Sequence, residues 1–155
     1  MDSSVPIFPV SHFAAWLQDQ GVDAAGLQTL MFGDSPELAA ELLELVAGGE
    51  KTATAGLLWR WLADEGAPPL AGQRYVVHDW SGAPVGLIEN AEVRVIPFVE
   101  VDLDFARAEG EGFETLAQWR EAHWAYFSRE CERLGHEVSE AMPVVCQRFR
   151  RLLPR

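Results

Sequence analysis

The chain has little cysteine and no long apolar run. Its two cysteines, Cys131 and Cys146, are isolated and match neither the spacing of a disulfide framework nor that of a zinc site. We therefore expect two reduced thiols that pack as small apolar side chains. No apolar run approaches the roughly 20 residues that a helix needs to cross a bilayer. Residues 1–4, Met-Asp-Ser-Ser, lack the basic start of a signal peptide. The sequence predicts a cytoplasmic protein with no membrane partner.

Basic residues are also scarce, since 12 Lys and Arg stand against 24 Asp and Glu and the formal net charge is −12. Proteins that bind long nucleic acids gain most of their affinity from contacts of Lys and Arg with phosphates. The average field of this chain repels phosphate, so nucleic-acid binding requires a local basic cleft. Otherwise the ligand is small and nearly neutral, which is the reading that the charge favours.

Histidine is present but scattered, which argues against a histidine-rich metal site. The four histidines are His12, His78, His123 and His136. We assign no metal ligands and no certain cofactor. A bound Mg²⁺ ion is expected only if the chain is a nuclease.

Apolar periodicity and capping residues predict an α+β fold. Helices are expected over residues 11–21, 24–31, 36–47, 57–62, 102–109 and 115–135. Strands are expected over residues 75–79, 85–95 and 144–149. A small β-barrel surrounded by helices would close these strands economically. We divide the chain into an N-terminal helical extension, residues 1–31, and one domain, residues 32–155.

Residues 48–55, Gly-Gly-Glu-Lys-Thr-Ala-Thr-Ala, bring a flexible turn, an amine and two hydroxyls together. A neutral Lys51 could activate the hydroxyl of Thr54, and a charged Lys51 could stabilise a phosphate or an oxyanion. In a regular strand, residues three apart point to opposite faces, so Lys51 and Thr54 converge only if the backbone bends. An exposed lysine beside β-forming threonines is the alternative. Thr52 is a candidate substrate contact.

Glu109 and Glu111 alternate with glycines, which let a backbone approach a ligand closely. Either carboxylate could orient Lys51, position a water or bind substrate. A solvated acidic turn in an acidic protein is the alternative.

One face of the longest predicted helix carries Arg120, Trp124 and Ser128, which recur at i, i+4 and i+8 and could line a cleft. Together with Trp59, the arginine plane and the indoles suit stacking on nucleobases. His123 fits the packed face of the helix better than a catalytic role.

Four motifs resemble those of the bacterial ASCH-domain family, the PUA-like domains named after an activating signal cointegrator. They are Phe32-Gly33-Asp34-Ser35-Pro36-Glu37-Leu38, Gly49-Glu50-Lys51-Thr52-Ala53-Thr54, Glu109-Gly110-Glu111-Gly112 and Trp119-Arg120-x-x-His123. The motifs occur in family order, and the resemblance runs from about residue 32 to residue 152.

The resemblance implies a β-barrel with surrounding helices and a cleft associated with RNA or modified nucleosides. Some relatives are magnesium-dependent nucleases on single-stranded RNA. Shorter members are amidohydrolases that remove the acetyl group from N4-acetylcytidine, and their lysine, threonine and glutamate correspond to Lys51, Thr54 and Glu109. A helix serine of the nuclease-type relatives corresponds to Ser128. This chain departs from the short members in its length and its N-terminal extension.

Three functions follow as alternatives, with single-stranded RNA or a modified nucleoside as the partner. The first is RNA hydrolysis, in which Lys51 holds the scissile phosphate, Ser128 contacts the substrate and Mg²⁺ assists. The second is amide hydrolysis, in which Thr54 attacks the acyl carbonyl, Lys51 shuttles the proton and Glu109 positions Lys51 or the leaving amine. The third is a non-catalytic reader of a base. We place RNA hydrolysis first.

Overall fold

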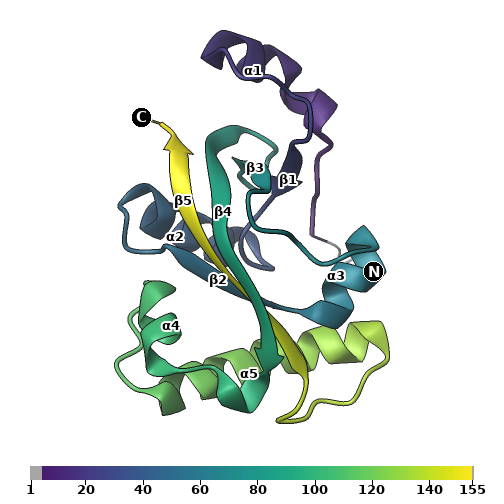
Figure 1. The fold of residues 1–155 in the computed structure, drawn as a ribbon, viewed down its shortest axis with the longest axis vertical. Helices are drawn as coiled ribbons and strands as arrows, with labels where there is room; N and C mark the ends of the chain where they lie inside the picture. The colour runs from purple at the N-terminus through teal and green to yellow at the C-terminus, as the bar shows by residue number, and fades with distance from the viewer. Residues whose placement is uncertain (1–4, 155) are drawn as a thin grey trace.

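The computed structural model describes residues 5–154 and forms an α+β fold around one five-stranded mixed sheet (Figure 1). The strands are β1 (Gln28–Leu30), β2 (Ala53–Leu57), β3 (Arg74–His78), β4 (Pro84–Pro97) and β5 (Pro143–Leu153). Their order across the sheet is β1-β3-β4-β5-β2. β1 runs parallel to β3, and the other neighbours are antiparallel.

The predicted closed barrel is wrong, because the sheet stays open. β1 and β2 are its two edges, and within residues 5–154 no ladder of hydrogen bonds joins them. The long pair β4–β5 shifts register between Leu87 and Ile88 and again between Asn90 and Glu92. Such irregularities bend a strand and increase its twist. The sheet is therefore bent, while one side of the β2 backbone remains free for other partners.

The helices surround the sheet, and three of them begin at residues whose side chains cap them. They are η1 (Val10–Phe13), α1 (Ala14–Gln20), α2 (Pro36–Ala47), α3 (Leu58–Glu65), η2 (Phe98–Glu100), α4 (Leu103–Ala108) and α5 (Leu116–Leu134). The hydroxyl of Ser35 accepts from Leu38 N at 3.1 Å, and Thr115 forms the predicted capping box with Gln118. These side chains satisfy backbone donors that have no partner inside the helix. The predicted starts of α2 and α5 are confirmed.

Within residues 5–154, three apolar cores pack against the sheet, one of them under the N-terminal segment, and the other two position the site. One core packs α4 and α5 against alternate residues of β2 and β5, including Trp119, Phe127 and Val144. The other packs α2 and α3 on the opposite side, around Leu42 and Phe149. The free edge of β2 therefore lies between α2 and α5. The candidate site lies at this edge.

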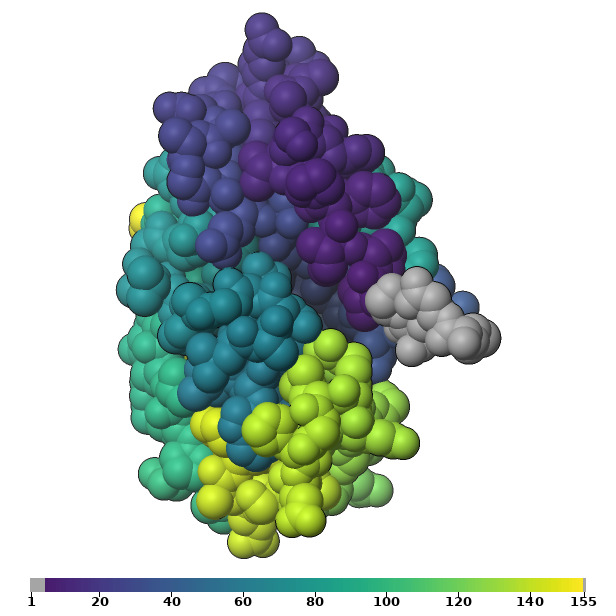
Figure 2. All heavy atoms as spheres, turned by 90° about the vertical axis from the view of Figure 1, so that its right-hand side faces the viewer, coloured from purple at the N-terminus to yellow at the C-terminus, as the bar shows by residue number. Residues whose placement is uncertain are grey.

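The N-terminal segment adds a strand as well as a helix. The helix predicted over residues 24–31 is wrong, because Gln28–Leu30 form β1 beside β3. Periodicity cannot separate a helix from a strand in so short a segment, and pairing with β3 decides the outcome. Figure 2 shows this segment, in purple, over the upper end of the molecule, with α3 beside the end of α5. Residues 1–4, on which the signal-peptide prediction depended, lie outside the described residues, and the division at residue 31 stays a prediction.

Both cysteines are buried and free. Burial raises the pKa of Cys131, and it raises the pKa of Cys146 to about 12, so the thiols stay protonated. This confirms the prediction of two reduced, packed thiols. The described residues contain no helix that is long and apolar enough to cross a membrane.

Candidate functional site

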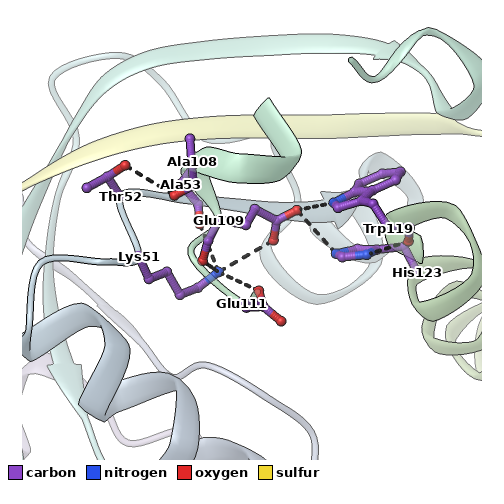
Figure 3. Close-up of polar contacts among 8 residues, drawn as sticks. All are labelled: Lys51, Thr52, Ala53, Ala108, Glu109, Glu111, Trp119 and His123. Carbon is purple, nitrogen blue, oxygen red and sulfur yellow. Dashed lines mark hydrogen bonds and ion pairs between the residues drawn. The ribbon is translucent and has the colours of Figure 1, made fainter. Parts of the chain in front are cut away.

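Lys51 is the only lysine of the chain, and its side chain is 1% exposed. Its Nζ donates to Ala53 O at 2.8 Å, to Glu111 Oε2 at 2.9 Å and to Glu109 Oε2 at 3.4 Å (Figure 3). An ammonium group has three protons to donate. These three contacts can use all of them, so the side chain of Lys51 is held between two carboxylates.

Close packing joins the Lys51 loop to the end of α4. Gly110 has φ +69°, and a Cβ at this position would lie 2.1 Å from Glu50 O, so only glycine fits. The N–H and the hydroxyl of Thr52 both donate to Ala108 O, at 2.8 and 3.1 Å. Gly110 thus lets the two flanking glutamates reach Lys51 from adjacent positions, and the hydroxyl of Thr52 is already occupied by this connection.

The second oxygen of Glu109 is held by α5. Its Oε1 accepts from Trp119 Nε1 at 2.6 Å and lies 3.2 Å from His123 Nε2. His123 Nδ1 lies 3.0 Å from Trp119 O, and the two rings stack at 4.1 Å. His123 is buried as predicted, but sequence reasoning missed its contact with Glu109. The available signal was its i, i+4 spacing from Trp119, which puts both side chains on one face of the helix.

The environments of the two glutamates drive their pKa values in opposite directions. Burial would raise the pKa of Glu109, but the charge of Lys51, then His123 and Trp119, lower it to about 2. Burial raises the pKa of Glu111, the negative charge of Glu109 raises it further, and Lys51 offsets this only in part. Glu109 therefore stays ionised, and Glu111 is the group that can gain and lose a proton.

Acid is expected to destabilise the protein through Glu109. Its pKa falls from the ordinary 4.5 to about 2 on folding, so its contribution is complete above about pH 4.5 and disappears as the pH falls towards 2. This difference in pKa corresponds to about 3 kcal/mol in the free energy of unfolding. In denaturant titrations between pH 2 and 7, the free energy of unfolding should fall more steeply with acid for the wild type than for Glu109→Gln. Glu111 opposes the effect, because a raised pKa favours the fold at low pH; equal slopes for the two proteins would contradict the assignment.

A cavity of about 190 Å³ opens beside this cluster, between α2, the edge of β2 and α5. Apolar and polar side chains from these elements form its wall. The lining residues are Gly33, Leu38, Leu42, Ala55, Glu109, Glu111, Phe113, Ala122, His123, Tyr126 and Arg129. Burial raises the pKa of Tyr126 to about 12, so its phenol remains a neutral donor. Lys51 lies directly behind the two glutamates.

The free edge of β2 adds backbone groups to the cavity. Phe149 N donates to Thr52 O at 3.0 Å, so Thr52 and every second residue after it are bonded to β5. Ala53 and Ala55 fall between these positions, and their backbone groups point to the free edge. Lys51 uses the carbonyl of Ala53. Ala55 also lines the cavity, so its N–H and C=O can offer one donor and one acceptor there.

Thr54 does not join the site. It lies opposite Gln147 in the ladder, and side chains alternate between the faces of a strand. Ala55 lines the cavity, whereas Thr54 is not among the lining residues. Within residues 5–154 no hydrogen bond connects its hydroxyl to Lys51 or Glu109. Of the three predicted catalytic side chains, the structure brings together Lys51 and Glu109, with Glu111 beside them.

Arg120 and Trp124 lie on another side of α5. They line a separate, open hollow of about 370 Å³ together with Phe98. Trp124 packs edge-on against Phe98, and Arg120 Nη2 donates to Val99 O at 3.0 Å. The predicted stacking residues therefore do not line the cavity beside Lys51.

Ser128 and Trp59 are also outside the lining of this cavity. The hydroxyl of Ser128 donates to Trp124 O, one turn back on α5, at 2.6 Å. The indole of Trp59 stacks on His136 at 4.0 Å and 5°. Both side chains already have partners within the protein.

Comparison with known proteins gives one family, and the similar solved structures include the three described below. The profile that describes the ASCH domain matches residues 28–152. The crystal structure of protein EF3133 from Enterococcus faecalis V583 is 31% identical, with a TM-score of 0.78, over 92% of this chain and 86% of that chain. An ASCH domain from Lactobacillus crispatus JV V101 is 32% identical, with a TM-score of 0.78, over 91% of this chain and 94% of that chain.

The third structure, hypothetical protein PH0355, is similar in fold alone. It is 14% identical, with a TM-score of 0.52, over 72% of this chain and 92% of that chain. The comparison with curated proteins gives no match.

Proposed function

This chain belongs to the ASCH-domain family, and we propose that it hydrolyses the amide bond of an N-acylated nucleobase bound in the cavity beside Lys51. The observation that carries this proposal is the pair Glu109 and Glu111. Both contact one buried ammonium, and their pKa values move apart. Such splitting is typical of acid–base catalysis, because it separates a permanent anion from a proton carrier.

The dimensions and polarity of the cavity favour a single base. Its volume of about 190 Å³ is below the roughly 300–1,000 Å³ of sites for drug-sized ligands, so one ring with a small substituent fits and a nucleotide does not. Leu38 and Phe113 offer apolar surfaces to the faces of a ring. Glu111, the phenol of Tyr126 and the backbone of Ala55 offer acceptors and donors to its polar edge.

In the proposed reaction Glu111 acts first as a base and then as an acid. Its carboxylate takes a proton from a water molecule, and the resulting hydroxide adds to the carbonyl carbon of the amide. The C–N bond then breaks, and the protonated Glu111 returns its proton to the leaving amine. The products are the free exocyclic amine of the base and a carboxylic acid.

Lys51 and Glu109 support this proton transfer. The ammonium of Lys51 stabilises the negative charge that develops on the carbonyl oxygen. When Glu111 takes up its proton, its hold on Lys51 weakens, and a donor becomes free at the moment the oxyanion forms. Glu109, which contacts Lys51, Trp119 and His123, is a positioning residue that holds the ammonium in place.

RNA hydrolysis, the first prediction from the sequence, remains a second proposal with weaker support. A phosphate at Lys51 would have to displace carboxylates and would meet their charge. A magnesium site fits poorly, because Mg²⁺ needs free carboxylate oxygens and Glu109 uses both of its own on protein donors. Within residues 5–154 no group of three or more His, Cys, Asp and Glu side chains could hold a metal ion.

Amide hydrolysis can be tested with a panel of N4-acylcytidines, by following release of cytidine. We expect turnover by the wild type, and we expect Thr54→Val to retain activity within about threefold, because Thr54 lies outside the cavity. If the activity of Thr54→Val is instead about 100-fold lower than that of the wild type, Thr54 is the nucleophile after all. Binding of the panel without turnover would leave a non-catalytic reader, and cleavage of labelled single-stranded RNA that disappears in Lys51→Ala would favour the nuclease.

A further inference from the structure

An ion pair lies at the mouth of the cavity. Arg129, on α5, lines the cavity, and its side chain is 57% exposed. Its Nε and Nη2 both donate to Asp34 Oδ2, at 3.2 and 3.1 Å. Asp34 follows Gly33, another lining residue, in the loop before α2. The pair therefore bridges the two walls of the cavity where it meets solvent.

The mouth is where the rest of a nucleoside has to lie. Because the cavity admits one ring, a bound base leaves its ribose outside, and a phosphate on that ribose would lie at the rim. Arg129 is the cationic lining residue that reaches this rim. A guanidinium matches a phosphate in geometry and charge. Its donors nevertheless face Asp34, and Glu111, also part of the lining, adds negative charge.

We propose that Asp34 makes the site selective for uncharged nucleosides, because it occupies Arg129 and so denies a phosphate its only cation at the mouth of the described cavity. This inference rests on the proposed function, and it names the substrate class as a free nucleoside rather than a nucleotide or an RNA strand. The carboxylate of Asp34 acts through charge. Its removal should convert the same mouth into a phosphate-binding one.

The direct test compares cytidine with cytidine 5′-monophosphate by calorimetry at low salt. The wild type should bind cytidine at least about fivefold more tightly than the monophosphate. Asp34→Asn should raise the affinity for the monophosphate about tenfold and leave that for cytidine within about twofold, because Arg129 is then free to donate to phosphate. The gain should disappear in the double variant D34N/R129Q and should shrink with added salt.

Asp64→Asn provides a matched control. Asp64 pairs with Arg133, also on α5, at 2.9 Å, and neither residue lines the cavity. Replacing Asp64 should change neither the affinity for cytidine nor the affinity for cytidine 5′-monophosphate. If cytidine binds and D34N alters both ligands equally, or R129Q does not cancel the gain, the inference is wrong and the proposed function stands. If no variant binds either ligand, the proposed function is wrong and the inference fails with it.

Discussion

Replacing Lys51 with methionine is expected to lower the free energy of unfolding by about 3–5 kcal/mol, the usual result of removing one partner of a buried ion pair. The ammonium neutralises Glu109, whose side chain is 2% exposed, and Glu111 beside it. Methionine fills a similar volume, so packing is largely kept. The loss would come from a carboxylate left in an apolar surrounding without its cation, and denaturant titration at pH 7 measures it.

Two variants separate this charge effect from a general loss of packing. The double variant K51M/E109Q removes both charges and should recover at least about half of the lost stability. Arg133→Met removes the pair with Asp64, in which both side chains are well exposed, and should cost at most about 1 kcal/mol. If the free energy of unfolding of Lys51→Met stays within about 1 kcal/mol of the wild-type value, the ammonium does not hold the two glutamates together.

Replacing Glu111 with glutamine is expected to reduce kcat for N-acylcytidine hydrolysis by about 10²- to 10³-fold, the range of a lost general base. Glutamine keeps the size of the side chain and can still contact Lys51 through its oxygen, but it cannot take up a proton. KM should change little, because the base and its apolar contacts remain. Steady-state kinetics on the same substrate panel provides the measurement.

The pH profile adds a readout that a purely structural role would not move. Wild-type activity should fall as acid protonates Glu111, at a pH above the ordinary range of a glutamate, since burial raises its pKa. The residual activity of Glu111→Gln should lack this acidic limb. Glu114→Gln, an exposed change in the same connection, is the matched control and should behave as the wild type. An unchanged acidic limb in Glu111→Gln would assign proton transfer to another group.

Local chemistry was enough to predict the helices that position the site. Ser35 and Thr115 mark the starts of α2 and α5 because their side chains satisfy the first backbone donors of each helix. The glycines around Glu111 predicted a close approach of the backbone to a ligand, whereas in the structure Gly110 lies against the backbone of Glu50.

Features that depend on pairing between distant segments could not be predicted in the same way. The edge position of β2 follows from the order of the strands, and no local pattern encodes that order. This position gives Ala55 its free backbone groups and turns Thr54 away from Lys51. Contacts from α5 likewise hold one oxygen of Glu109, which lines the cavity together with Glu111.

The most direct measurement follows the single side-chain ammonium resonance of ¹⁵N-lysine-labelled protein, which Lys51 alone supplies. If Lys51 is held between Glu109 and Glu111 behind a base-binding cavity, its protons should exchange slowly. The resonance should then shift as cytidine fills the site. A rapidly exchanging signal that stays fixed at saturating cytidine would contradict the account.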